Sequence, residues 1–476
     1  MLDFSAYIII TIYLLVLFYL GVFFSKKQKS INDYFNGGQR IPSWAAGLSI
    51  FGTVLSPITF LAIPAKTYAT DWSYFIFNIS ILIITPIIVF FFLPIYRKLN
   101  VSTAYEFLEK RFDLSIRLIG AFCFIVFQIG RIGIVLFLPS LVLNLVLDLN
   151  IFFCIMTMGF VSLFYTFFGG IEAVIWTDVI QVFVLLSGIV VSVLYLFNLV
   201  DGGLFEIIKL AKGENKFNII DFSFSLKQPT LWVVLLGGIF TNISTYGTDQ
   251  TIVQRYLVTS DTNKAKKSIW VNAIMSVPSS IIFFFIGTAL YVFYNQFPNE
   301  LSQKIFMDDA IFPWFIITQL PSPVSGLLIA SIFAAAMSSL SSSMNSGASS
   351  YLNDFHKRLF GKKENDLKSA KYSTLVIGFV GILFSWLLAS YEIKSLWDEF
   401  NKILGLVIGS LGGVFLLGIL TKKANSHGVL IGFLITVIIQ IIVSYFDFIN
   451  LLLYSATGVI SCFILGYIFS LIIKKT

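Results

Sequence analysis

The sequence Ser49-Ile-Phe-Gly-Thr-Val-Leu-Ser-Pro-Ile-Thr59 lies in an apolar segment long enough to span a membrane, yet it carries two helix-breaking residues. Gly52 loosens the backbone, and Pro57 removes one helical hydrogen bond and disfavours helical geometry at Ser56. A second interruption, Thr241-Asn-Ile-Ser-Thr-Tyr-Gly-Thr-Asp-Gln250, places polar residues where lipid demands apolar ones. Interrupted helices at matching places in two halves of a chain are typical of inverted repeats with a site near the membrane midplane. Two ordinary helix kinks are the alternative.

The composition of the whole chain requires a membrane. Of its 476 residues, 57% are hydrophobic and 12% are charged, and the mean hydropathy is +0.89. A soluble domain is about one quarter charged. The sequence therefore predicts an all-α protein embedded in a lipid bilayer. Its three cysteines, Cys123, Cys154 and Cys462, lie in apolar runs and indicate neither disulfides nor a metal site.

Apolar runs predict one transmembrane domain, residues 1–476, with about 13 helices. We expect a leading helix near 5–25, ten helices that follow it, and two trailing helices within 426–473. The ten are expected near 42–70, 73–96, 117–147, 151–168, 175–199, 229–257, 268–294, 321–351, 371–391 and 397–420, and the trailing pair near 426–446 and 449–473. The first run is not a convincing signal peptide, because Asp3 precedes it and no small-residue cleavage site follows.

Basic residues indicate how the chain is oriented. Counted over the loops of this map, 23 of the 32 Lys and Arg residues lie on one side and 7 on the other, with Lys26, Lys27 and Lys29 on the richer side. Cytoplasmic loops carry the excess of positive charge, so the N-terminus is expected outside and the C-terminus in the cytoplasm. This distribution also accounts for the net charge of +7 without a nucleic-acid partner.

Arg131 lies near the centre of the helix expected at 117–147, within Phe127-Gln-Ile-Gly-Arg-Ile-Gly-Ile-Val135. Either end of that helix is roughly 20 Å away, too far for the side chain to reach water. A guanidinium at that depth needs a partner, and its fork of donors suits a carboxylate. The partner is either the carboxylate of a substrate or an internal acid such as Asp178 or Asp249.

A serine-rich helix supplies the second candidate site, within Ala334-Ala-Ala-Met-Ser-Ser-Leu-Ser-Ser-Ser-Met-Asn-Ser346. Ala335, Ser338 and Ser339 share one helix face because they stand at positions i, i+3 and i+4. Their oxygens, with the carbonyls that a broken helix frees at Gly52 and Leu55, suit a hard cation. Close helix packing through small residues is the alternative.

Asp178 lies just inside the helix expected at 175–199, where it is either a buried cation ligand or an interfacial cap. The sequence contains no nucleotide-binding loop, metal-ligand cluster or Ser/His/Asp arrangement that would support catalysis. We therefore do not expect an enzyme.

Three further segments resemble the sodium:solute symporter family: Asp33-Tyr-Phe-Asn-Gly-Gly-Gln-Arg40, Gly169-Gly-Ile-Glu-Ala-Val-Ile-Trp-Thr-Asp-Val-Ile-Gln181 and Asp249-Gln-Thr-Ile-Val-Gln-Arg-Tyr256. The resemblance implies a leucine-transporter-type fold with five-plus-five inverted repeats, here 42–199 and 229–420. It also implies sodium-coupled alternating access. No obligatory protein partner is evident in the sequence. The family's sodium site would map to Gly52, Leu55, Ala335, Ser338 and Ser339.

Within the family, the bacterial sialic acid (N-acetylneuraminate) branch fits best, because Leu61-Ala-Ile-Pro-Ala-Lys-Thr-Tyr-Ala-Thr-Asp-Trp72 and the Gly-Arg131 pair look like that branch. There the arginine binds the carboxylate of a small anionic sugar. By this resemblance Ser56 and Thr59 add hydroxyl contacts, Asn78 faces the glycerol tail, and Tyr74 helps to close the outer side.

Two residues depart from the branch. Val54 stands near the substrate where a threonine is expected. A second sodium would use Asp178 with the serines, but Ala335 replaces a serine there, so one or two sodium ions per cycle are both open. A bacterial inner membrane is the expected location.

Three alternatives remain open. The chain could be a symporter of the same family for another carboxylate, such as proline, pantothenate or a monocarboxylate. It could be a membrane sensor that uses the transporter fold, although the chain ends at Thr476 directly after the last helix. A channel fits an interrupted, polar midplane less well than alternating access does.

Overall fold

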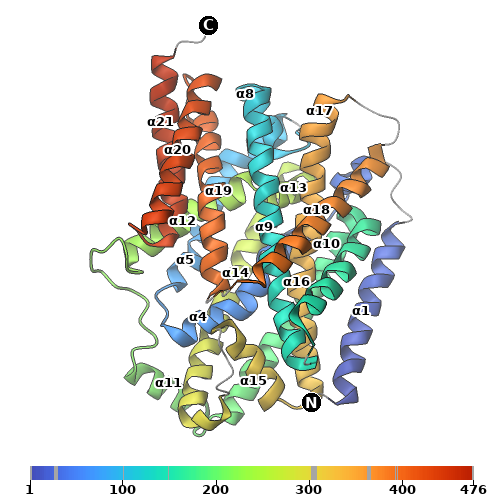
Figure 1. The fold of residues 1–476 in the computed structure, drawn as a ribbon, viewed down its shortest axis with the longest axis vertical. Helices are drawn as coiled ribbons and strands as arrows, with labels where there is room; N and C mark the ends of the chain where they lie inside the picture. The colour runs from blue at the N-terminus through green and yellow to red at the C-terminus, as the bar shows by residue number, and fades with distance from the viewer. Residues whose placement is uncertain are drawn as a thin grey trace.

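The computed structural model describes residues 3–25, 31–99, 101–147, 149–301, 308–361, 366–391, 393 and 395–473, and within them it is helical without strands (Figure 1). Its α-helices are α1 Phe4–Ser25, α2 Ile31–Asn36, α3 Ser43–Val54, α4 Ile63–Ala69, α5 Phe75–Ile79, α6 Ile81–Ile87, α7 Leu93–Leu99, α8 Ala104–Arg111, α9 Leu114–Leu147, α10 Ile151–Leu199, α11 Gly203–Gly213, α12 Leu231–Thr248, α13 Gln250–Leu257, α14 Thr262–Gln296, α15 Ile311–Gln319, α16 Ser322–Ser350, α17 Lys357–Leu359, α18 Asp366–Leu388, α19 Leu396–Leu420, α20 Ser426–Phe446 and α21 Tyr454–Ile472. Single turns of π-helix, Ile58–Ala62, Ile88–Phe92 and Tyr351–His356, extend α4, α6 and α16. Lys26, Lys27 and Lys29 lie outside the described residues.

Eleven helices of the described chain are long and apolar enough to cross a membrane, and one bent pair makes a twelfth span. The segment Ile151–Phe164 is apolar but shorter. Counting it gives the predicted set of about 13 helices, so the all-α membrane architecture is confirmed. This segment belongs to the helix predicted at 151–168, which is joined to the one predicted at 175–199 as α10. The two meet at a kink at Gly170, whose φ of 59° only glycine adopts readily.

The first predicted interruption separates α3 from the π-turn that leads into α4. The backbone leaves helical geometry at Leu55 (φ −78°, ψ 78°), and the two halves are bent by 59°. Pro57 begins the second half at a position where its missing N–H costs nothing. The sequence therefore breaks this helix where glycine and proline predicted it.

The second interruption separates α12 from α13 at Asp249. This residue is extended (φ −71°, ψ 115°), and its carboxylate caps α13 by accepting a 2.7 Å hydrogen bond from the N–H of Thr251. Both predicted breaks are thus present, each in the middle of a polar cluster. Two ordinary kinks do not describe them, since each break ends one helix and begins another.

Helix α16 occupies the centre of the bundle, and nearly all of its residues from Ser325 to Ser350 are buried. It packs against α9, α10 and α18, and α1 covers α10 and α16 at one edge (Figure 1). Helices α19, α20 and α21 pack together at the opposite edge. Of the broken helices, α3 packs mainly against α10 and α14, α12 packs against α19, and α13 packs against α14 and α16.

Candidate functional site

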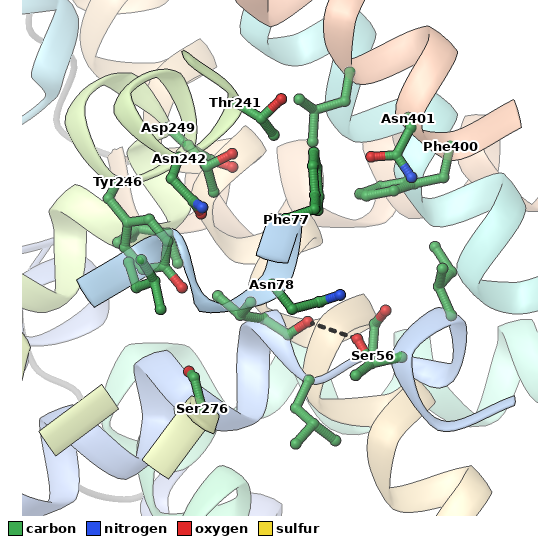
Figure 2. A pocket seen from close by; sticks show the side chains of 18 of the residues that line it. Ser56, Phe77, Asn78, Thr241, Asn242, Tyr246, Asp249, Ser276, Phe400 and Asn401 are labelled. Carbon is green, nitrogen blue, oxygen red and sulfur yellow. Dashed lines mark hydrogen bonds between the residues drawn. The ribbon is translucent and has the colours of Figure 1, made fainter. Parts of the chain in front are cut away.

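A cavity of about 140 Å³ lies where the two breaks meet (Figure 2). Its walls come from α3 and the first break, α5, α9, α12, the second break, α14 and α19. The polar residues that line it are Ser56, Thr59, Asn78, Arg131, Thr241, Asn242, Thr245, Tyr246, Asp249, Ser276, Ser279, Ser280 and Asn401, and the apolar ones include Val54, Leu55, Phe77, Phe127, Trp397 and Phe400.

Arg131 extends from α9 into this cavity and is 6% exposed. Its Nη2 donates a 2.7 Å hydrogen bond to the carbonyl oxygen of Thr53. Its Nη1 lies 3.8 Å from Oδ2 of Asp249, an ionic contact longer than a hydrogen bond, and its Nε has no hydrogen-bond partner among the described residues. The guanidinium therefore has donors left for another carboxylate. Of the two internal acids considered, it is Asp249 and not Asp178 that lies beside Arg131.

Arg131 and Asp249 are the charged residues among the described residues that line the cavity. Asp249 also contacts Nε2 of Gln128 at 3.4 Å. The walls around them offer hydroxyls, amides and aromatic rings. Such a site suits a polar ligand that carries one negative charge.

The predicted cation ligands meet where α16 crosses the end of α3. The hydroxyl of Ser338 lies 2.9 Å from the carbonyl oxygen of Gly52 and 3.0 Å from that of Ala335. The hydroxyl of Ser339 donates to the carbonyl of Thr53 at 3.1 Å. Leu55 lies at the break itself. Oxygens of this kind are those that a hard cation prefers.

Asp178 is fully buried on α10, which excludes the interfacial-cap interpretation. Its Oδ2 accepts hydrogen bonds from Arg255 at 3.0 Å and from Ser49 at 2.5 Å, while its Oδ1 has no hydrogen-bond partner in the described part of the chain. Arg255 is also fully buried and donates to Ser342 at 2.5 Å. The pair therefore ties α3, α10, α13 and α16 together.

The structure separates one predicted substrate residue from the others. Ser56, Thr59, Asn78 and Val54 line the cavity, but Tyr74 does not. The Tyr74 ring lies 5.1 Å from Nζ of Lys66, and that amine forms a 3.1 Å ion pair with Asp398. This cluster joins α4, α5 and α19 beside the cavity.

Several lining residues were not predicted as ligands. Thr241, Asn242 and Tyr246 come from the polar stretch that predicted the second break, so the sequence carried a signal for them (Figure 2). Trp397, Phe400 and Asn401 come from the start of α19, and nothing in the sequence distinguishes them from other interfacial residues. Only the packing of α19 against α12 and the first break brings them to the site.

The fold and this site define a secondary transporter, and the chain belongs to the sodium:solute symporter family, whose model matches residues 34–436. Among curated relatives, it is 39% identical to the sodium/sialic acid symporter NanT of Aliivibrio fischeri over 97% of this chain and 92% of that protein. It is also 39% identical to the sodium/sialic acid symporter SiaT of Proteus mirabilis over 98% and 95%.

A solved structure of a sodium-coupled sialic acid symporter, in a substrate-bound outward-open state, matches with a TM-score of 0.93 and 37% identity over 99% of this chain and 98% of that one. A nucleobase-cation-symport-1 family transporter matches with a TM-score of 0.66 at 15% identity over 93% and 95%, which shows the shared fold alone. The predicted family and the leucine-transporter-type fold are confirmed, and the protein is not an enzyme.

Proposed function

We propose that this protein is a sodium-coupled symporter that imports sialic acid, N-acetylneuraminate, by alternating access. The observation that carries the proposal is Arg131, a buried guanidinium with free donors in a polar cavity next to a cluster of cation-binding oxygens. Near full-length similarity to two sodium/sialic acid symporters supports the substrate. Arg131 binds the sugar carboxylate.

The rest of the sugar fits the remaining walls. Ser56, Thr59 and Asn78 offer hydroxyl and amide groups to its polar substituents, and Val54 gives an apolar contact at one end. Of the unpredicted residues, Asn242 and Asn401 add two further amides. Proline or a short monocarboxylate has fewer polar substituents for these groups to contact, which disfavours those substrates.

One sodium ion binds between the end of α3 and α16, at the oxygens of Gly52, Leu55, Ala335, Ser338 and Ser339. The hydrogen bonds from the Ser338 hydroxyl to the carbonyl oxygens of Gly52 and Ala335 support this site, because they bring three of the proposed ligand oxygens within about one hydrogen-bond length of each other. A second sodium at Asp178 would have to share that carboxylate with Arg255, so only its unpartnered Oδ1 is open to it.

The protein is a multi-span protein of the bacterial inner membrane, with its N-terminus outside and its C-terminus in the cytoplasm. The uneven distribution of Lys and Arg among the loops supports this orientation. The inverted repeats comprise 42–199 and 229–420, each with one broken helix. Tyr74, Lys66 and Asp398 lie on the outer side of the cavity and help to close it.

Calorimetric titration of N-acetylneuraminate into the purified protein tests the substrate. We expect binding in sodium buffer and weaker binding when choline replaces sodium. Proline and pantothenate, titrated in parallel, should not bind. Binding of either one with no binding of the sugar would overturn the assignment.

A further inference from the structure

The cavity contains one fixed positive and one fixed negative charge. Of the described residues that line it, Arg131 is the cation and Asp249 the anion, and they lie 3.8 Å apart. The next buried pair, Asp178 and Arg255, is already neutral within itself. The empty cavity therefore carries no net charge.

Partial loading changes this balance. The sugar carboxylate alone brings the cavity to −1, and sodium alone, bound beside Thr53, brings its surroundings to +1. Sodium and the sugar together restore zero. Burying an uncompensated charge in a dry protein interior is costly, so the two half-loaded forms resist occlusion while the empty and the fully loaded forms do not.

We propose that Asp249 sets the coupling between sodium and sugar by serving as the permanent counter-charge of Arg131. This inference rests on the proposed function. Asp249 lines the cavity and acts through its ionic contact with Arg131. Its effect is that a carboxylate substrate can be occluded only together with a cation.

The geometry allows Asp249 to keep this role when the sugar binds. Its position is fixed at the start of α13 by the hydrogen bond from the N–H of Thr251, at 2.7 Å, and by the contact with Gln128. The two side chains approach to 3.8 Å, between Nη1 of Arg131 and Oδ2 of Asp249, which is longer than a hydrogen bond. Nη1 can therefore donate a hydrogen bond to a substrate carboxylate while Asp249 stays in place.

The site for sodium is connected to the same pair. The carbonyl of Thr53 accepts hydrogen bonds from Arg131 and from Ser339, a proposed sodium ligand. A cation among those oxygens thus lies near the guanidinium and its two anions. Arg131 repels the sodium ion, but Asp249 and the substrate carboxylate together carry two negative charges. The attraction of the sodium ion to the second of these charges offsets that repulsion.

Asp249→Asn tests this role. Asparagine keeps an oxygen for Thr251 and is as good a helix cap as aspartate, so the fold should survive. The variant cavity holds +1 when empty and zero with the sugar alone. Sodium should raise the sugar affinity of the natural protein by about 5- to 150-fold, a typical coupling, but that of Asp249→Asn by less than about twofold.

Two further variants serve as controls. Asp249→Glu keeps the charge and should keep the sodium enhancement of sugar affinity. Glu106→Gln removes an equal charge from a surface pair with Lys110 and should also keep it. Asp249→Asn that retains the full enhancement would overturn the inference.

The sodium midpoint of thermal stabilisation, measured without sugar at constant ionic strength, gives an independent test. Arg131→Gln leaves Asp249 without its cation, so this variant should bind sodium several-fold more tightly than the natural protein does. Asp249→Asn should bind sodium more weakly than the natural protein. Equal sodium midpoints in the three proteins, or midpoints in the reverse order, would overturn the inference. If the natural protein does not bind N-acetylneuraminate at all, the proposed function fails, while these midpoints still decide the role of Asp249.

Discussion

Arg131 and Ser339 donate hydrogen bonds to one atom, the carbonyl oxygen of Thr53, at 2.7 Å and 3.1 Å. The first side chain comes from α9 and the second from α16, and Thr53 is the last but one residue of α3. A shift of this carbonyl therefore changes the hydrogen bonds of both Arg131, the proposed sugar ligand, and Ser339, a proposed sodium ligand. Reciprocal coupling between two sites requires such a shared element.

Substitution of Arg131 tests the carboxylate contact. Arg131→Ala should abolish sugar binding, because removing a buried charged partner costs about 2–5 kcal/mol. Arg131→Lys keeps the charge but loses the forked geometry, and we expect it to lose most of the affinity. Calorimetric titration measures both, and normal affinity in Arg131→Ala would contradict the contact.

Substitution of Ser338 tests the sodium site. Ser338→Ala removes an oxygen that lies within 3.0 Å of two of the other proposed ligands, so the sodium concentration for half-maximal uptake should rise about tenfold or more. Ser331→Ala is the matched control, since this serine on the same helix donates to the carbonyl oxygens of Val184 and Leu327 and to no proposed sodium ligand among the described residues. Equal sodium dependence in both variants would argue against the site.

The Asp178–Arg255 pair is expected to hold the helices together. Asp178→Asn leaves a fully buried guanidinium without its anion, which should reduce stability by about 3–5 kcal/mol. Adding Arg255→Gln should restore part of that loss, and thermal unfolding of the single and double variants gives the coupling. A stable Asp178→Asn that loses only its response to sodium would instead favour a second sodium at this residue.

Gly287 lets α14 approach α4, the second half of the first broken helix. A Cβ at this position would lie 2.3 Å from the carbonyl oxygen of Pro64 and 2.7 Å from Cβ of Thr67. Gly287→Ala should therefore displace α4 or destabilise the protein by about 1–3 kcal/mol, and slow uptake. Gly213→Ala meets nothing within 4 Å and should leave uptake and melting temperature unchanged. Indistinguishable variants would contradict this packing.

Local chemistry made much of the fold predictable. Gly52 and Pro57 broke the first helix where their backbone preferences require, and the polar stretch before Asp249 marked the second break. The hydropathy of the spans reflects the bilayer directly, so their approximate limits could be read from the chain. The kink at Gly170 falls between the helices predicted at 151–168 and 175–199, although the helix continues on both sides of it as α10.

The site was predictable only in part. Arg131 was found because a charge at midmembrane depth has few explanations. Its neighbour could not be chosen between Asp178 and Asp249, since the choice depends on how α9, α10 and α13 pack. The walls from α19 were missed for the same reason: Trp397 and Asn401 reach the cavity only through tertiary contacts.

Uptake of labelled N-acetylneuraminate into proteoliposomes tests the central claim most directly. We predict accumulation above the external concentration when sodium is driven inward, and none when choline replaces sodium. An inside-negative potential should add nothing for one sodium per anionic sugar, whereas two sodium ions would gain about 2.3 kcal/mol per 100 mV. Folded protein that shows no sodium-dependent uptake of the sugar would contradict the account.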